Sequence, residues 1–202
     1  MNLNYSYYYF KGALTPRFCK EVIDFAKSKK EVLGRVGNIE DKNLSKKQIK
    51  NIQKDRDSNV CWMDDRWVSR EILPYVKEAN INAGWNFQWD QSENCQFTIY
   101  RKNQYYDWHC DSWDKPYEEG SSKGKIRKLS VTCSLSDPED YKGGELQFYK
   151  STVKQNKKIN CSEIAEKGSV VVFPSFVYHR VKPVTKGVRY SLVVWNLGNP
   201  FI

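Results

Sequence analysis

The sequence NCQFTIYRKNQYYDWHCD, residues 94–111, opens the half of the chain that decides the fold. Polar and apolar side chains alternate in residues 96–101, which is typical of a strand with one face toward a cavity and one toward a core. Further β-type segments follow, separated by turn residues, and cover 105–109, 126–135, 145–149, 169–173, 178–182 and 189–195, with an eighth expected near 159–165. About eight short antiparallel strands predict a jelly-roll barrel.

Helical patterns dominate the first ninety residues. The aromatic residues 5–10 suit an opening strand, and Thr15-Pro16 predicts the cap and first position of a helix over 16–30. A second helical pattern covers 64–83, where we expect Pro74 to break or restart the helix. This region should therefore pack helices against the barrel.

Two segments of the same region are not helical in pattern. Residues 34–58 are poor in apolar side chains and predict a long loop, or a partly mobile insertion, that could cover a site. Trp85, Phe87 and Trp89 alternate as in a strand.

Helices followed by strands indicate an α+β chain with a jelly-roll core and N-terminal helices packed on one of its faces. We expect the jelly-roll core to cover 94–197 and a helical and aromatic support region to cover 1–93. At 202 residues the chain fits a single domain, 1–202, and shows no internal repeat.

The chain is basic, with 33 Lys and Arg against 24 Asp and Glu. The excess concentrates in residues 42–56 and 123–128. A charged surface that keeps the protein soluble explains these groups most simply, and a footprint for nucleic acid or an acidic substrate is the alternative.

The six cysteines are scattered, with no C-x-x-C pair, so reduced thiols are expected rather than a zinc site or a disulfide framework. The first residues lack the pattern of a signal peptide, and no eighteen apolar residues run together. We therefore expect a soluble cytoplasmic protein with no membrane partner.

The chain contains only two histidines, His109 and His179. Asp111 follows His109 by two positions, so both side chains can reach one metal if the strand continues that far, with Cys110 facing away. Asp107 has the same parity, and the spacing does not choose between the two carboxylates. Two imidazoles and one carboxylate are the ligand set of non-haem Fe(II) oxygenases.

Arg189 shares one face of the last strong strand with Ser191 and Trp195. If this face lines the barrel, the buried guanidinium needs a carboxylate, and a ligand carboxylate is the simplest partner, with Ser191 adding a hydroxyl. An exposed arginine on an edge strand is the alternative. Tyr100 is a candidate for a phenolic hydrogen bond to the same ligand, or else an ordinary core tyrosine.

These motifs together resemble the 2-oxoglutarate- and Fe(II)-dependent dioxygenases, and are most similar to their prolyl 4-hydroxylase-like branch. The resemblance covers about residues 94–197 and is carried by QFTIY (96–100), YDWHCD (106–111), GGEL (143–146), KGSVVVFP (167–174), His179 and Arg189.

The resemblance implies a double-stranded β-helix in which His109, Asp111 and His179 bind iron. It implies that Arg189 holds the distal carboxylate of 2-oxoglutarate, with Tyr100 and Ser191 also contacting this co-substrate. We expect the substrate pocket to include Trp195, Tyr106 and Trp113. No catalytic side chain is expected beyond the metal centre.

The implied function is hydroxylation of a C–H bond with Fe²⁺, 2-oxoglutarate and O₂, releasing succinate and CO₂; a requirement for ascorbate is left open. A prolyl residue of a peptide or protein is the first candidate substrate, and a free amino acid or other small molecule is the second. The second arginine typical of nucleic-acid demethylases is missing from 190–201, which argues against a nucleic-acid substrate. A non-enzymatic jelly-roll module that binds nucleic acid or glycan is the remaining alternative.

Overall fold

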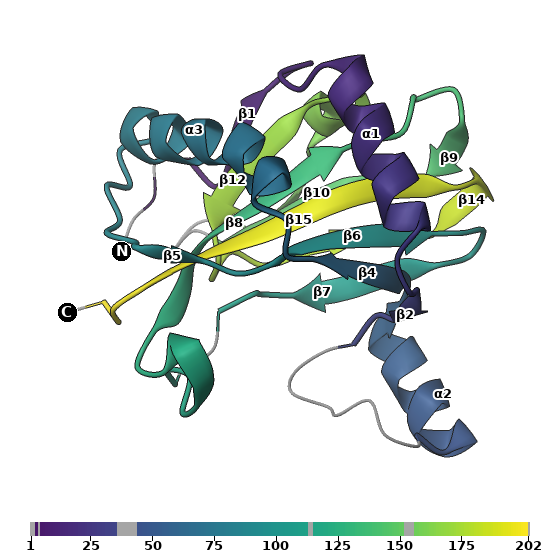
Figure 1. Cartoon of the computed structure of the whole chain (residues 1–202), viewed down its shortest axis with the longest axis horizontal. Coiled ribbons are helices and arrows are strands. Elements are labelled where there is room, and N and C mark those ends of the chain that lie inside the picture. The colour runs from purple at the N-terminus through teal and green to yellow at the C-terminus, as the bar shows by residue number, and fades with distance from the viewer. Residues whose placement is uncertain (1–2, 4, 36–43, 113–114, 152–155, 202) are drawn as a thin grey trace.

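The structure is a computed structural model that describes residues 3, 5–35, 44–112, 115–151 and 156–201. Its centre is built from antiparallel β-sheets (Figure 1). The large sheet follows the order β1 (Tyr8–Phe10), β12 (Val170–Pro174), β8 (Ile126–Ser134), β15 (Arg189–Gly198), β6 (Cys95–Tyr100), β4 (Asn59–Met63) and β2 (Val32–Leu33), and β5 (Gln91–Ser92) pairs with β15. Each of the seven strand segments predicted with a clear pattern after residue 94 overlaps an observed strand.

A second sheet lies behind the large one and carries part of the site. Its order is β11 (Asn156–Asn160), β10 (Leu146–Ser151), β13 (His179–Val181), β7 (Tyr105–His109) and β3 (Arg56–Asp57), and a short ribbon pairs β14 (Val184–Gly187) with β9 (Tyr141–Gly143). Side chains from both sheets, including Tyr100, Phe148, Phe173 and Val181, form one buried apolar cluster. The α+β jelly-roll prediction is confirmed.

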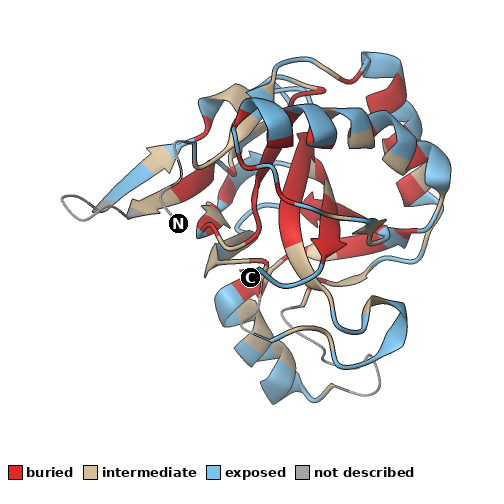
Figure 2. Ribbon diagram, turned by 90° about the vertical axis from the view of Figure 1, so that its left-hand side faces the viewer, coloured by how far each residue is buried: buried red, intermediate tan, exposed pale blue. Residues whose placement is uncertain are grey.

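Two helices cover the outer face of the large sheet, α1 (Pro16–Lys27) and α3 (Arg66–Asn82). Their buried residues join the larger apolar cluster together with strands β6, β8 and β12. Figure 2 shows the buried strands at the centre with the helices around them. Among the described residues, no helix combines the length and the apolar character that crossing a membrane requires.

The predicted loop over 34–58 is wrong for its second half. Residues 46–55 form α2 (Lys46–Asp55), and β3 follows it directly. Ser45 caps the helix in a capping box with Gln48, and this local signal outweighs the shortage of apolar residues. Residues 36–43 lie outside the described part of the chain.

The expected break at Pro74 and the expected strand at Trp85–Trp89 are also wrong. Helix α3 runs through Pro74 because Ile72, Val76 and Ala79 anchor it in the core. Phe87 is not in a strand because the Asn80 side chain bonds both its N–H and its carbonyl, at 2.9 Å each. These two groups are therefore not available for a sheet.

Candidate metal centre and active-site cleft

The two histidines lie opposite each other on neighbouring strands. His179 on β13 pairs in register with His109 on β7, and a bulge follows between His179 and Val181. Asp111 lies just beyond the end of β7, where its N–H donates to the Ser175 carbonyl at 2.8 Å. The chain therefore leaves the sheet before Asp111. Cys110 does not line the pocket that contains the two imidazoles, and it lines a cleft further out together with Asp111.

One donor atom from each of His109, Asp111 and His179 lies within 4.8 Å of the other two. The Nε2 atoms of His109 and His179 are 3.7 and 3.6 Å from the Asp111 carboxylate. Each Nδ1 contacts a backbone carbonyl, Asp107 at 2.7 Å or Val177 at 3.0 Å. A carbonyl only accepts, so each Nδ1 carries the proton and each Nε2 keeps its lone pair for a metal.

The other candidate carboxylate lies elsewhere. The Asp107 side chain is 55% exposed and forms an ion pair with Arg180 at 3.8 Å, whereas Asp111 is buried. The geometry thus brings Asp111, and not Asp107, to the two imidazoles.

The protonation states suit a cation. Burial lowers the pKa of His109 to about 3, and the neighbouring His179 acts in the same direction. Burial alone would raise the pKa of Asp111, but His179, His109 and Arg127 hold it below its usual value. A neutral imidazole of His109 and an ionised Asp111 are the forms that a metal binds.

A narrow pocket of 40 Å³ extends inward from these residues, and its walls include Tyr100, Ser191 and Trp195. Arg189 begins β15 beside Tyr100, with its guanidinium 5.5 Å from the Tyr100 ring centre. It is 2% exposed, and its Nη1 has no hydrogen-bond partner among the described residues. A Cβ at Gly144 would lie 2.9 Å from the Arg189 side chain, so this glycine leaves it room.

Strand β6 has one face toward this pocket and one toward the core, as its alternating sequence predicts. Gln96 and Tyr100 on β6 line it, while Phe97 and Ile99 on the same strand pack in the larger core. A buried guanidinium with an unpaired nitrogen is an observation that fits an anionic ligand.

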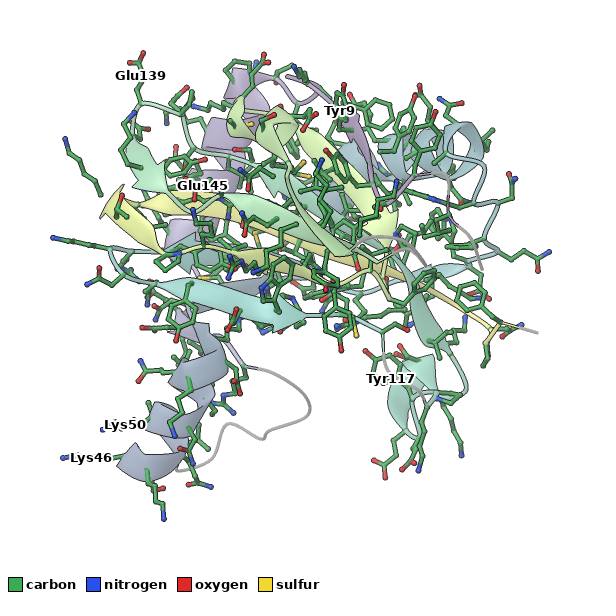
Figure 3. The ribbon with its side chains drawn as sticks, turned by 180° about the vertical axis from the view of Figure 1, so that it is seen from behind. Tyr9, Lys46, Lys50, Tyr117, Glu139 and Glu145 are labelled. Carbon is green, nitrogen blue, oxygen red and sulfur yellow. The ribbon has the colours of Figure 1, made fainter. Side chains whose placement is uncertain are left out.

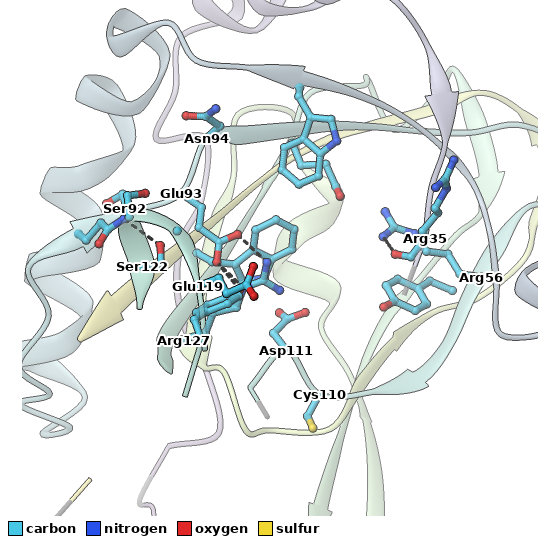
Figure 4. Close-up of a pocket in the computed structure, with 18 residues that line it drawn as sticks. Arg35, Arg56, Ser92, Glu93, Asn94, Cys110, Asp111, Glu119, Ser122 and Arg127 are labelled. Atoms are coloured by element: carbon cyan, nitrogen blue, oxygen red, sulfur yellow. Dashed lines mark hydrogen bonds and ion pairs between the residues drawn. The ribbon is translucent and has the colours of Figure 1, made fainter. Parts of the chain in front are cut away.

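A wider cleft of 580 Å³ lies outside the narrow pocket and shares Tyr106, Asp111 and Trp195 with it. Figure 4 shows Arg35 and Arg56 on one wall, Glu93, Glu119 and Arg127 on the other, and Asp111 between them. Trp113 lies outside the described residues. Figure 3 shows that α2, with Lys46 and Lys50, and the segment of Tyr117 both project downward from the barrel, at the left and at the right of the view.

Arg127 and Arg56 are among the cleft arginines that were missed from the sequence. Arg127 binds both carboxylate oxygens of Glu93 and lies 3.9 Å from the centre of the Trp195 ring system. Arg56 follows α2 and is 4% exposed. Each lies in a lysine-rich stretch that is typical of a solvated surface, and no local pattern distinguishes it from its exposed neighbours.

A jelly-roll barrel with two imidazoles and a carboxylate gathered at its mouth, beside a buried arginine, has the architecture of a mononuclear metal oxygenase. The sequence model of the 2OG-Fe(II) oxygenase superfamily matches residues 95–196, half of the chain. The chain belongs to this superfamily. The family uses Fe(II) and 2-oxoglutarate, and two imidazoles with one carboxylate are a donor set that fits Fe(II).

Curated relatives include PKHD-type hydroxylases. PiuC of Pseudomonas aeruginosa (PAO1) is 33% identical over 145 residues, 68% of this chain and 59% of the relative. A PKHD-type hydroxylase of Synechococcus sp. (JA-3-3Ab) is 42% identical over 67 residues, 33% of this chain and 27% of the relative. The matched part of the chain thus spans less than two thirds of these relatives.

Solved structures share the fold. The viral collagen prolyl hydroxylase vCPH from Paramecium Bursaria Chlorella virus-1, in its 2OG complex, superimposes with a TM-score of 0.64 at 19% identity, covering 96% of this chain and 97% of that one. A Trichoplax adhaerens prolyl hydroxylase, in complex with a hypoxia inducible factor peptide fragment, gives 0.63 at 19% identity, covering 96% and 84%.

Proposed function

We propose that this protein is an Fe(II)- and 2-oxoglutarate-dependent dioxygenase that hydroxylates a prolyl residue of a peptide or protein. The observation that carries the proposal is the convergence of His109, Asp111 and His179 within 4.8 Å. Beside them lies the buried Arg189, whose Nη1 has no hydrogen-bond partner among the described residues. The proposal rests on this chain's own side chains as well as on its family.

His109, Asp111 and His179 would hold the iron. In both histidines, the hydrogen bond from Nδ1 to a backbone carbonyl fixes the orientation of the imidazole, so the Nε2 lone pairs need not reorganise on metal binding. When bound, Fe(II) supplies the chemistry by which O₂ converts 2-oxoglutarate to succinate and CO₂ and hydroxylates the substrate.

Arg189 would bind the distal carboxylate of 2-oxoglutarate through charge-assisted hydrogen bonds that satisfy its Nη1. Tyr100 and Ser191 would donate hydroxyl hydrogens to the same co-substrate from the pocket walls. The pocket has room for only a few water molecules, so we expect its walls to move apart when the co-substrate enters.

Apolar side chains would keep water from the inner side of the centre. The Phe173 ring centre is 4.6 Å from that of His179, and Phe148 and Val181 pack in the same buried cluster. A reactive centre benefits from this dry surface, because excluding water prevents side reactions.

The wide cleft supports a peptide substrate. Tyr106 and Trp195 line both the cleft and the narrow pocket, so a group held between them would lie next to Asp111. The cleft volume of 580 Å³ exceeds what a single amino acid fills, and the fold neighbours include a prolyl hydroxylase with a bound peptide fragment.

Release of labelled CO₂ from 2-oxoglutarate tests the proposal. Protein supplied with Fe(II) and O₂ should release CO₂ faster when proline-containing peptides are added, and mass spectrometry should find peptide gaining one oxygen atom. His179→Ala should remove both signals. Stimulation by free amino acids and not by peptides would replace the prolyl substrate with a small molecule.

A further inference from the structure

Arg56 is a buried cation whose charge no carboxylate neutralises among the described residues. Its side chain donates from Nε to the Ser58 hydroxyl and from Nη1 to the Arg35 carbonyl, at 2.8 Å each. Both acceptors are neutral. Arg101, by contrast, is bound to both carboxylate oxygens of Glu31.

A buried guanidinium without an opposite charge is strongly unfavourable. The face of the Tyr106 ring, 4.6 Å from the Arg56 guanidinium carbon, offers a cation–π contact that compensates only in part. The fold therefore keeps Arg56 buried at a cost in stability, which is typical of a group that awaits an anionic ligand.

The side chain is fixed in place from one side. A Cβ on Gly34 would lie 2.8 Å from the Arg56 Nε and 2.3 Å from the Ser58 hydroxyl, so the backbone at Gly34 presses close to both. With Nε and Nη1 engaged, the guanidinium is oriented before any ligand arrives, which lowers the entropic cost of binding.

The position of Arg56 ties it to the reacting centre. It lines both the wide cleft and the narrow pocket. The ring of Tyr106, which it covers, stacks on the His109 imidazole with the ring centres 3.4 Å apart. A group bound by Arg56 would therefore lie one aromatic ring away from a candidate metal ligand.

The opposite wall of the cleft carries Glu119, together with the Glu93–Arg127 pair (Figure 4). A carboxylate entering the cleft would be repelled by Glu119 and attracted to the wall of Arg35 and Arg56. This separation of charge gives a substrate one favoured orientation.

We propose that Arg56 binds a carboxylate of the substrate, so that the enzyme selects a proline with an acidic residue close to it. This inference rests on the proposed function and names its substrate class. The distal carboxylate of 2-oxoglutarate is assigned to Arg189, which leaves Arg56 for the acidic group of the substrate.

Matched peptides test the inference. In each pair, one glutamate is placed at a chosen position beside the proline and is replaced by glutamine in the partner. With Fe(II) and saturating 2-oxoglutarate, at least one glutamate peptide should show a KM about tenfold or more below that of its glutamine partner. If the glutamate and glutamine peptides of every pair have equal KM values with the unmodified protein, the inference is overturned.

Variants then locate the preference. Arg56→Gln should abolish it, Arg56→Lys should keep part of it because the charge remains, and Arg101→Gln, which removes an exposed arginine, should leave it unchanged. Thermal unfolding and the KM for 2-oxoglutarate are measured for each. A preference that persists in a folded Arg56→Gln protein, or a KM change confined to 2-oxoglutarate, contradicts the assignment.

A separate binding experiment distinguishes failure of this inference from failure of the proposed function. If no peptide stimulates turnover, the prolyl proposal fails, and calorimetry compares N-acetylglutamate with N-acetylglutamine on the anaerobic protein loaded with Fe(II) and 2-oxoglutarate. Tighter binding of the acid that Arg56→Gln abolishes supports the carboxylate site. Equal binding of the two compounds overturns it.

Discussion

Asp107 and Asp111 show how two carboxylates of the same strand parity acquire different surroundings. Asp111 is buried between two imidazoles, whereas Asp107 is exposed and pairs with Arg180. The sequence pattern alone could not separate them, because the bend that follows His109 is not encoded by alternation.

Exchange of each carboxylate for its amide tests the ligand assignment. Asp111→Asn should lose bound Fe(II) and CO₂ release, since an amide supplies no anionic oxygen. Asp107→Asn should retain both to within about twofold, because an exposed ion pair contributes little. Metal content and CO₂ release from the two purified proteins give the result, and loss in Asp107→Asn alone would reverse the assignment.

Removal of the Arg189 charge should raise the 2-oxoglutarate requirement. A lost charge-assisted pair costs about 2 to 5 kcal/mol, so the KM for 2-oxoglutarate of Arg189→Gln should rise at least tenfold. Arg17→Gln, which removes an exposed arginine on α1, is the matched control. An unaltered KM in Arg189→Gln would place the co-substrate carboxylate elsewhere.

The site residues differed in how far the sequence could predict them. His109 and His179 were predicted because the chain has no other histidine, and Arg189 was predicted from its strand face and the family resemblance. Arg56 was not, because its burial depends on the β3–β7 pairing and on the backbone at Gly34, which only the folded chain provides.

At the scale of elements, α2 shows that a short polar helix depends on its ends. None of its residues is buried, although the helix contacts β3 and β7. The Ser45 hydroxyl accepts from the N–H of Gln48, and the Gln48 side chain accepts from the N–H of Ser45. Apolar periodicity could not reveal this helix, whereas the capping pair could have done so.

Ser45→Ala should therefore loosen α2 selectively. Loss of a capping side chain costs about 1 kcal/mol, which corresponds to roughly fivefold faster hydrogen exchange of α2 amides. Helix α1, capped by Thr15, serves as the internal reference. Equal acceleration in both helices would show a general loss of stability instead.

Helix α3 and the segment after it illustrate tertiary control over local propensity. Packing of Ile72 and Val76 holds the helix through Pro74, and the Asn80 amide takes up the backbone groups of Phe87. Both features depend on contacts between residues that no local pattern connects, so neither could be predicted from the sequence.

At the scale of the whole molecule, the positions of the main strands along the chain were predictable, and the neighbours with which they pair in the sheets were not. Alternation located the strands after residue 94, but the two-residue strands β2, β3 and β5 exist only because a neighbour offers an edge. The N-terminal half thus contributes strands to both main sheets, beyond its predicted helices.

Buried thiols should make the protein sensitive to alkali. All six cysteines are described and are free thiols. Burial raises the pKa of Cys95 and of Cys161 to about 12, from an ordinary value of 9.0. The stability that this proton retention represents is present below pH 9 and is lost as the pH rises toward 12, by about 1.4 kcal/mol per pH unit for each thiol.

Urea unfolding at a series of pH values above 8 measures this loss. The free energy of unfolding should fall more steeply in the native sequence than in Cys95→Ala, which removes one of the buried thiols whose pKa is raised. The comparison of slopes separates the thiol effect from the lower starting stability that the cavity in Cys95→Ala causes. Parallel slopes would contradict the contribution of Cys95.

The pairing of His109 with His179 across β7 and β13 gives the metal a second significance. Side chains alternate along a strand, so a slip of one residue would turn one imidazole to the opposite face. A misaligned barrel would then be unable to hold iron. Iron binding during refolding thus reports on strand alignment, because only molecules with the correct register place both imidazoles at the metal.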